Sequence, residues 1–354
     1  MRVVELSGSP GARGRHHGEL LAREIRVMRL AALKYLGKIT LYVGAWPLYA
    51  FLKGLSRRFR PYLTPDLNEE LQAMAEGARL PRATLLLINC LDDLANNIPR
   101  CSALAVGERL TFKGQYLAGR NLDYPLFTEV LLPLQTLFQV TPEQGIPYVS
   151  LAWPGYLGVS TGLNRAGVAL AQLSVMSRKT TIRGMPAALR YRQALEKGDT
   201  AMAVARRVLD QPGTIGNNLL ICAPREAVVL ELAPSRFFAR RPVAGLLTVT
   251  NHFQSLAMSA VQGAFSRRPP YSVLDPQHFT EAYSKARDAK LRELAAAGPL
   301  TPKDLQKILG HPQIANPGTV NSVVFDPERL TLWVATHDKT PVSRGRFVEL
   351  KPWS

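Results

Sequence analysis

The sequence has 354 residues, of which 46% are apolar and 20% are charged, and this composition excludes a disordered chain and allows a sizeable buried core. Its formal charge of +17 predicts a negatively charged partner, but the absence of zinc-finger spacing, aromatic RNA-binding strands and leucine-zipper repeats argues against nucleic acid. The 3 cysteines form no CxxC pair and follow no signal peptide, which argues against a disulfide scaffold or thiolate metal site and favours a cytoplasmic location.

Residues 15–95 show the apolar spacing of helices, and His16 and His17 have no metal-ligand partners at useful spacing. Within this part, residues 34–60 carry only basic charges around the apolar run "ITLYVGAWPLYAFL". The run is shorter than the roughly 20 residues that span a bilayer. It predicts either a buried helical hairpin with a solvated basic face, or a segment that lies on an anionic membrane or covers an acyl-binding groove.

A cysteine begins the next apolar stretch, "CSALAVGERLTFKGQYLAGRNLDY" at 101–124. Runs 102–106 and 115–119 predict a β-hairpin that puts Arg120 roughly opposite Cys101, with Asp123 at the strand end. A guanidinium lowers the pKa of a neighbouring thiol, and a carboxylate can orient a nearby amine. The missing part is a general base. If the Arg100–Cys101 bond were cut, the new α-amine of Cys101 could take the thiol proton.

The remainder of the chain alternates short β-like runs with pairs of helical segments, at about 186–211 and 284–310. The β-like runs include "YVSLAW", "VALAQLSVM", "NLLICA", "AVVLELA", "LLTVTN", "NSVVFD" and "TLWVAT". Hairpins with paired helices indicate antiparallel sheets covered by helices, which is an α+β layered fold. This organisation disfavours Rossmann and TIM-barrel architectures.

Several motifs occur in order along the chain: "GSPGARGRHHGELLAREI" at 8–25, Cys101 with its strand, "GRNLDY" at 119–124, "GLNRAG" at 162–167, "TNHF" at 250–253, "SKAR" at 284–287 and "NSVVFDPERLTLWVA" at 321–335. This ordered set resembles the choloylglycine hydrolase and isopenicillin-N acyltransferase-like (peptidase C45-type) superfamily of N-terminal-nucleophile (Ntn) hydrolases. Acid ceramidase and N-acylethanolamine acid amidase are similar at the same motifs.

The resemblance implies a four-layer αββα sandwich of antiparallel sheets with a helical N-terminal prodomain. Residues 1–100 would be the prodomain and residues 101–354 the catalytic domain, separated by self-cleavage between Arg100 and Cys101 through an N-to-S acyl shift. The two chains would stay together as an αβ heterodimer. The resemblance implies neither a cofactor nor a metal.

The resemblance also implies roles for individual residues. Cys101 would be the nucleophile and, through its freed amine, the general base. Arg120 would polarise the thiol and the substrate carbonyl, and Asp123 would orient the amine. Asn251 would donate to the oxyanion, and Arg287 would stabilise the pocket or a substrate anion.

The implied activity is that of a cysteine amidohydrolase or acyltransferase. It would act on a small-molecule linear N-acyl amide, with a fatty-acyl group favoured, through an acyl-Cys101 intermediate. Bile-salt hydrolases have an asparagine where this chain has Ser174, and the penicillin acyltransferase has a glycine in place of Arg100. The first difference weakens a bile-salt assignment, and the second bears on the efficiency of self-cleavage. Nothing in the sequence points to penicillin formation.

Two alternatives remain. "GVSTG" at 158–162 fits the G-x-S-x-G elbow of α/β-hydrolases, with Ser160, Asp326 and His337 in the order of a serine esterase triad. The elbow requires a helix after the serine, whereas "LNRAGVALAQL" predicts a turn and a strand. The second alternative is a non-catalytic protein that binds acyl groups or membranes on an Ntn scaffold.

Overall fold

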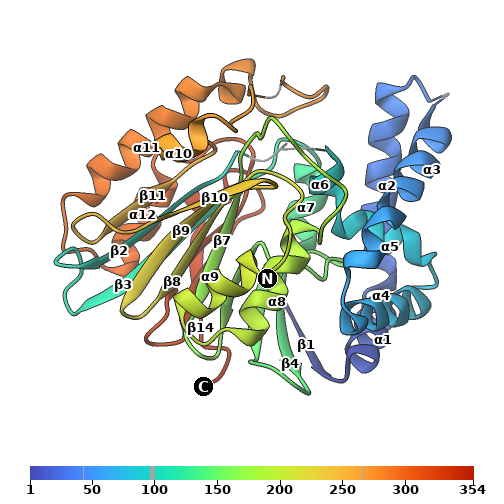
Figure 1. The fold of residues 1–354 in the computed structure, drawn as a ribbon, viewed down its shortest axis with the longest axis horizontal. Coiled ribbons are helices and arrows are strands. Elements are labelled where there is room, and N and C mark those ends of the chain that lie inside the picture. Colours follow the sequence, from blue (N-terminus) through green and yellow to red (C-terminus); the bar gives the residue numbers. More distant parts are fainter. Residues whose placement is uncertain (43, 96–99, 266) are drawn as a thin grey trace.

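The computed structural model describes residues 1–42, 44–95, 100–265 and 267–354. Two β-sheets form its middle layers, and helices cover both outer faces (Figure 1). The first sheet contains, in spatial order, β1 (Arg2–Gly8), β4 (Thr136–Pro142), β5 (Tyr148–Ala152), β6 (Thr161–Asn164), β7 (Ala169–Ser174), β8 (Asn217–Ala223), β9 (Glu226–Ala233) and β10 (Arg236–Arg240). The second contains β11 (Leu246–Val249), β2 (Ser102–Glu108), β3 (Gly114–Asp123), β12 (Thr319–Asp326), β13 (Thr331–Thr336) and β14 (Arg346–Leu350).

The helices of the described residues lie mainly in three parts of the chain. Those before Cys101 are α1 (Pro10–Leu20), α2 (Ala22–Ile39), α3 (Ala45–Ser56), η1 (Arg57–Tyr62), α4 (Pro65–Ala78), α5 (Arg82–Asn89) and α6 (Leu91–Ala95). The middle part has α7 (Thr128–Leu134), α8 (Ala187–Lys197), α9 (Ala201–Leu209) and α10 (Leu256–Ser259). The last part has η2 (Pro276–Phe279), α11 (Glu281–Ala295), α12 (Pro302–Gly310) and η3 (Val342–Arg344).

Apolar cores fill the spaces between the layers. The first lies between the eight-stranded sheet and α4, α5, α8 and α9, the second between the two sheets, and the third between the six-stranded sheet and α11 and α12. Strand β2 shows how the alternation of side chains builds two cores at once. Ala103 and Ala105 face the other sheet, whereas Leu104 and Val106 face the helices. The expected four-layer αββα fold is confirmed.

The first part of the chain contributes a strand to the eight-stranded sheet and helices to the layer that covers it. Strand β1 pairs in parallel with β4, while the other strand pairs described are antiparallel. Helix α1 packs closely on α4 because Gly14 and Gly18 have no side chain, and a Cβ at either position would collide with the α4 backbone. The helical pattern expected for residues 15–95 is confirmed. Residues 96–99, which directly precede Arg100, and residue 43 lie outside the described residues.

His17 has a structural role in this layer. Its Nε2 accepts a hydrogen bond from the backbone N–H of Gly155 at 3.0 Å, and its ring lies against Phe138 with centroids 4.8 Å apart. Burial lowers the pKa of His17 to about 4, so the ring is neutral and can serve as this acceptor. The hydrogen bond ties α1 to the loop before β6.

Candidate active site

The hairpin expected at Cys101 forms, but its register differs from the sequence prediction. Arg120 pairs with Ala103 rather than standing opposite Cys101. An irregularity between Val106 and Glu108, where the pairing slips by one residue, accounts for half of this difference. The other half arises because the turn is centred slightly later in the chain than the predicted midpoint. Because residues two apart on a strand share a face, Arg120 still reaches Cys101 as a diagonal neighbour.

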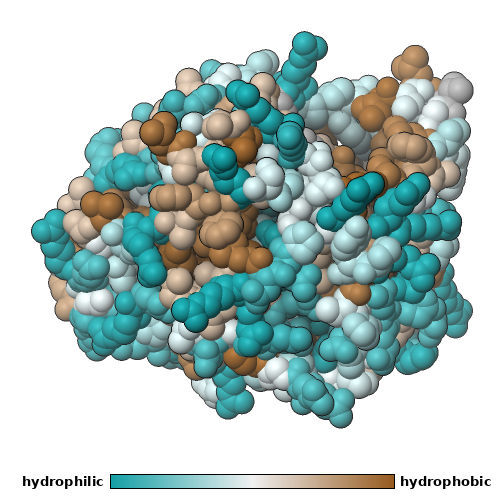
Figure 2. Space-filling model, viewed as in Figure 1, coloured by the Kyte–Doolittle hydropathy of each residue, from teal (hydrophilic) through white to brown (hydrophobic). Residues whose placement is uncertain are grey.

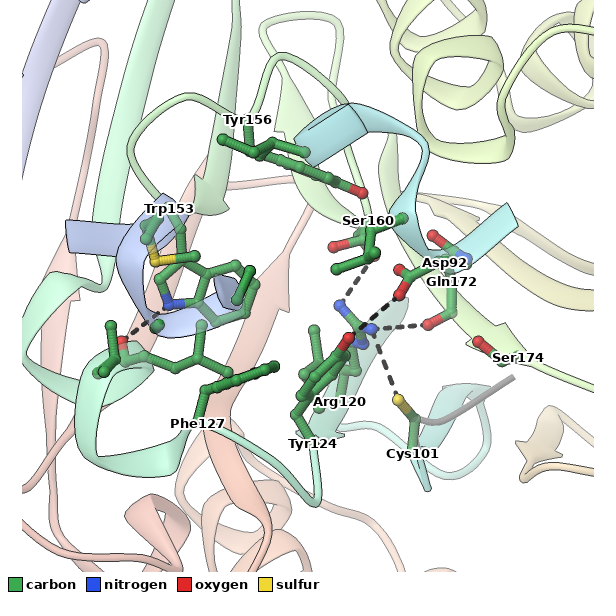
Figure 3. Close-up of a pocket in the computed structure, with 18 residues that line it drawn as sticks. Asp92, Cys101, Arg120, Tyr124, Phe127, Trp153, Tyr156, Ser160, Gln172 and Ser174 are labelled. Carbon is green, nitrogen blue, oxygen red and sulfur yellow. Dashed lines mark hydrogen bonds between the residues drawn. The ribbon is translucent and has the colours of Figure 1, made fainter. Parts of the chain in front are cut away.

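The guanidinium of Arg120 lies beside the Cys101 thiol inside the protein (Figure 3). Its Nη2 is 3.7 Å from Cys101 Sγ and also donates to the backbone oxygen of Gln172 at 2.7 Å, while Nη1 donates to the backbone oxygen of Ser160 at 2.8 Å. Two carbonyls of the opposite sheet thus hold the guanidinium in place. Burial raises the pKa of the Cys101 thiol, and the Arg120 charge opposes that shift. The thiol of the uncut chain therefore requires a base.

Asp123 ends strand β3 and is fully buried. Its carboxylate accepts hydrogen bonds from Asn316 Nδ2 at 2.6 Å and Thr319 Oγ1 at 2.7 Å, and Arg287 Nη1 lies 3.5 Å from its Oδ2. Burial raises the pKa of Asp123 to about 6, and Arg287 and these hydrogen bonds limit the increase. The backbone oxygen of Asp123 accepts a hydrogen bond from the N–H of Arg100 at 2.8 Å. This hydrogen bond places the end of β3 beside the Arg100–Cys101 bond.

Arg287 joins the other expected site residues. Its Nη1 donates to the backbone oxygens of both Arg100 and Cys101 at 2.9 Å, and its Nη2 donates to Asn251 Oδ1 at 2.9 Å. The side chain is only 1% exposed, so Arg287 does not belong to the solvated surface of its helix. Asn251 in turn donates from Nδ2 to the backbone oxygen of Ser174 at 2.8 Å.

Arg100 is also buried, and several contacts fix its position. Besides the two backbone hydrogen bonds, its Nε donates to the backbone oxygen of His278 at 3.2 Å, and its guanidinium lies 4.5 Å from the centre of the Phe279 ring. Burial, with the nearby charge of Arg287, lowers the pKa of Arg100 to about 10. The bond expected to be cut is therefore held at the amide nitrogen, the carbonyl oxygen and the side chain of Arg100.

Cys101 opens onto an apolar cavity of about 120 Å³. Cys101, Arg120, Ser160, Gln172 and Ser174 lie at its polar end (Figure 3). The other lining residues come largely from α2, α5, α6 and α7 and from the segment around Trp153: Met28, Ala31, Ala32, Ile88, Leu91, Asp92, Leu122, Tyr124, Phe127, Val130, Leu131, Trp153 and Tyr156. The part of the chain before Cys101 thus forms one wall of the cavity.

Sequence reasoning missed several residues of the site. Two of them hydrogen-bond to Asp123: Asn316, just before β12, and Thr319, its first residue. The only local signal there is the sequence "NPGT", which is typical of a turn. Asp92 lines the cavity without belonging to any motif used for the prediction, and Tyr124, which ends the "GRNLDY" motif, received no role there. Residues as far apart in the sequence as Asp123 and Asn316 form no local pattern that would predict their contact.

The serine esterase alternative fails on its structural context. Ser160 immediately precedes strand β6, and no helix follows it, whereas a nucleophile elbow joins a strand to a helix. The other two residues of the expected triad have other partners. Asp326 accepts a hydrogen bond from the backbone N–H of Arg329 at 3.1 Å, and His337 Nδ1 lies 2.8 Å from Asp338 Oδ1. Ser160 instead contributes its backbone oxygen to the site of Arg120.

Comparison with known proteins identifies the family and the fold of this chain. Residues 111–340, well over half of the chain, match the family described as acyl-coenzyme A:6-aminopenicillanic acid acyl-transferase. An N-acylethanolamine-hydrolyzing acid amidase of Caenorhabditis elegans is 30% identical over 122 residues, which are 33% of this chain and 33% of that protein. An uncharacterized protein of Archaeoglobus fulgidus is 25% identical over 224 residues, which are 56% of this chain and 37% of that protein.

The chain spans about a third of the length of these curated relatives. A solved structure of the Caenorhabditis elegans N-acylethanolamine-hydrolyzing acid amidase ortholog shows the same fold, with a TM-score of 0.50 and 18% identity, covering 71% of this chain and 100% of that one. The fold and the family match confirm the resemblance seen in the sequence. This protein therefore belongs to the acyl-coenzyme A:6-aminopenicillanic acid acyltransferase family, a family of Ntn amide hydrolases and acyltransferases.

Proposed function

We propose that this protein is a cysteine Ntn amidohydrolase or acyltransferase that acts on a linear N-acyl amide through an acyl-Cys101 thioester. One observation carries the proposal: Cys101 Sγ faces a fixed guanidinium at 3.7 Å and, on the same side, an apolar cavity. A purely structural cysteine has no need of either. Cys222, in the same inter-sheet core, has the backbone oxygen of Ala223 rather than a guanidinium as its described hydrogen-bond partner.

The proposed maturation cuts the chain before Cys101. Sγ attacks the Arg100 carbonyl carbon, the peptide nitrogen leaves as the α-amine of Cys101, and water hydrolyses the resulting thioester to give the Arg100 carboxylate and a free thiol. The hydrogen bond from Arg287 Nη1 to the Arg100 oxygen is directed at the atom that becomes negative. The position of β1 within the sheet supports retention of residues 1–100 after the cut.

The same groups support the proposed turnover. The freed amine of Cys101 accepts the thiol proton, Arg120 stabilises the thiolate, and Asp123 orients the amine. Sγ attacks the substrate carbonyl, the protonated amine of the substrate leaves, and an acyl-thioester remains. Attack by water then gives hydrolysis, and attack by a second amine gives acyl transfer.

Asn251 is the proposed donor to the oxyanion that forms in this turnover. Asn251→Ala is expected to lower kcat/KM by about a hundredfold or more, because loss of one such donor typically costs 10²–10³ in rate. Steady-state kinetics on fully matured enzyme would measure the effect. The exposed Gln277→Ala is the control, and unchanged kinetics in Asn251→Ala would remove Asn251 from the reaction.

The cavity supports an apolar acyl group on the substrate. Its lining is predominantly apolar, and its volume of about 120 Å³ is below the roughly 150 Å³ of a cavity that binds benzene. A fatty-acyl chain, which we favour, would place its first carbons in this cavity and extend beyond it. Incubating the protein with N-acyl amides of increasing chain length, and detecting the acyl-Cys101 adduct by mass, tests the proposal. Lack of turnover and of an adduct with every chain length would refute it.

A second candidate function is attachment to an anionic membrane through α2, α3 and the turn between them. Leu41, Tyr42, Trp46 and Phe51 are exposed there, with Lys34 and Lys38 nearby. Figure 2 shows apolar side chains gathered over the place where Figure 1 draws these helices. In the described residues, no helix is long and apolar enough to cross a membrane. An apolar surface with basic flanks fits the interface of an anionic bilayer.

Trp46→Glu is expected to weaken sedimentation with phosphatidylserine-containing vesicles by roughly tenfold or more, because it replaces a large apolar side chain with a negative one. Phe112→Glu is the matched control, since Phe112 is equally exposed but lies in the β2–β3 turn. Equal binding of wild type to phosphatidylcholine vesicles, or no effect of Trp46→Glu, would contradict membrane attachment by this surface.

A further inference from the structure

The apolar cavity contains one acidic side chain among its described lining residues, that of Asp92. Asp92 lies on α6, in the part of the chain before Cys101, and its carboxyl group points toward the Tyr124 hydroxyl (Figure 3). An ionised group facing apolar walls is unfavourable unless a partner compensates it. The position of Asp92 is therefore a feature of the cavity that packing alone does not explain.

The hydrogen bonds of Asp92 leave most of its capacity unused. A carboxylate can accept about four hydrogen bonds, yet the described partner of Asp92 is the Tyr124 hydroxyl at 3.5 Å, which is at the limit of a hydrogen bond. The charge of Arg120 favours the ionised form, but the described hydrogen bonds of its guanidinium go to Cys101 and to the backbone oxygens of Ser160 and Gln172. Burial raises the pKa of Asp92 to about 6.

The next residue in the chain, Asp93, differs from Asp92 because hydrogen bonds within the protein occupy its carboxylate. Asp93 points away from the cavity, where it accepts the backbone N–H of Ala187 at 3.0 Å and the hydroxyl of Thr214. These contacts tie α6 to α8 and to the loop before β8. Asp93 thus has a structural role, whereas Asp92 presents unused acceptor oxygens to the space in front of Cys101.

We propose that Asp92 makes the cavity selective for acyl groups that carry a hydrogen-bond donor, either a hydroxyl or an amino group. The inference rests on the proposed function, because it takes the cavity as the site of the acyl chain. A donor on the chain would fill the acceptor capacity of Asp92 while the methylene groups contact the apolar walls. A site built to bond a polar substituent discriminates strongly against the analogue that lacks it, since the buried group then stays unpaired.

Asp92 belongs to the part of the chain before Cys101, although it lines the cavity at Cys101. Residues 1–100 supply this side chain, so the preference of the catalytic site depends on a segment that lies before the proposed cut. Loss of that segment after cleavage would remove Met28, Ile88 and Asp92 from the cavity together. Selectivity is therefore a property of the two chains in association.

The test compares matched amides. Propanoyl to hexanoyl amides of one fluorogenic amine would be compared with the same amides that carry a terminal hydroxyl or amino group. At the best chain length, wild type is expected to prefer a substituted chain in kcat/KM, and Asp92→Leu is expected to reduce that preference by roughly 10- to 100-fold. Asp92→Asn should retain more of the preference for the hydroxyl chain than for the amino chain, because an amide oxygen accepts a hydrogen bond but carries no charge. The exposed Asp66→Asn, on α4 of the same segment, is the control for a lost charge.

A binding experiment keeps this inference separate from the proposed reaction. Calorimetry with the free acids of the same chains, on the Cys101→Ala protein, requires no turnover. Tighter binding of the substituted acids that disappears in Cys101→Ala/Asp92→Leu supports the role of Asp92 even if no amide is cleaved. Equal preference in wild type and Asp92→Leu, or tighter binding of the unsubstituted acids, overturns it. Turnover of unsubstituted amides alone would refute the role of Asp92 and leave the proposed function standing.

Discussion

Cys101→Ala is expected to remain one uncut chain with no measurable amide turnover, while the wild-type protein yields a fragment that begins at Cys101. The substitution removes the sulfur that forms both proposed thioesters, so no slower route through the same residue remains. The fold should persist. Alanine suits a strand whose neighbouring inward residues are Ala103 and Ala105, and the two carbonyls of Ser160 and Gln172 still hold Arg120.

Intact mass and N-terminal sequencing of the fragments measure this outcome directly. Cys222→Ala is the matched control, because it removes a buried thiol from the same core without touching the proposed site. Alkylation of Cys101 in the wild type would show that the thiol is reachable even where the chain is uncut. Cleavage before residue 101 in the alanine variant, or retained turnover, would contradict the assignment of Cys101 as nucleophile.

Local sequence patterns predict the elements of this fold better than they predict register. The runs at 102–106 and 115–119 lie in β2 and β3, and the paired helical patterns match α8 with α9 and α11 with α12. The predicted pairing of Arg120 was wrong by two residues, because the turn is centred slightly later in the chain than the predicted midpoint and the irregularity near Glu108 adds a slip of one residue. The contact with Cys101 survived because the diagonal position lies on the same face.

The burial of Arg287 could have been predicted from spacing. Ser284, Arg287, Asp288, Leu291 and Ala295 are the buried residues of α11, and they recur at intervals of three and four, as a single helix face does. Lys285, a basic residue of the same helix, lies on its opposite, exposed face. By contrast, no local pattern joins Asp123 to Asn316 and Thr319, which are brought together only by the pairing of β3 with β12.

Arg287→Met is expected to slow the proposed maturation by roughly a thousandfold or more. One oxyanion donor is typically worth 10²–10³ in rate, and Arg287 donates to the Arg100 oxygen while also holding Asn251 and approaching Asp123. Arg287→Lys should show an intermediate loss, because an ammonium keeps the charge but cannot bond both backbone oxygens and Asn251 with the fixed fork of a guanidinium. The appearance of the fragment beginning at Cys101, followed by mass over time, measures the rate.

Loss of stability must be separated from loss of chemistry in this experiment. Removing one partner from a buried ion pair costs about 3–5 kcal/mol in general, so the melting temperature of Arg287→Met should fall as well. Lys285→Met, on the exposed face of the same helix, is the matched control and should mature at the wild-type rate. If Arg287→Lys is as stable as the wild type and still matures slowly, the donor geometry of Arg287 is what the reaction needs. Wild-type maturation in Arg287→Met would show instead that the hydrogen bond to the Arg100 oxygen serves only to position the chain.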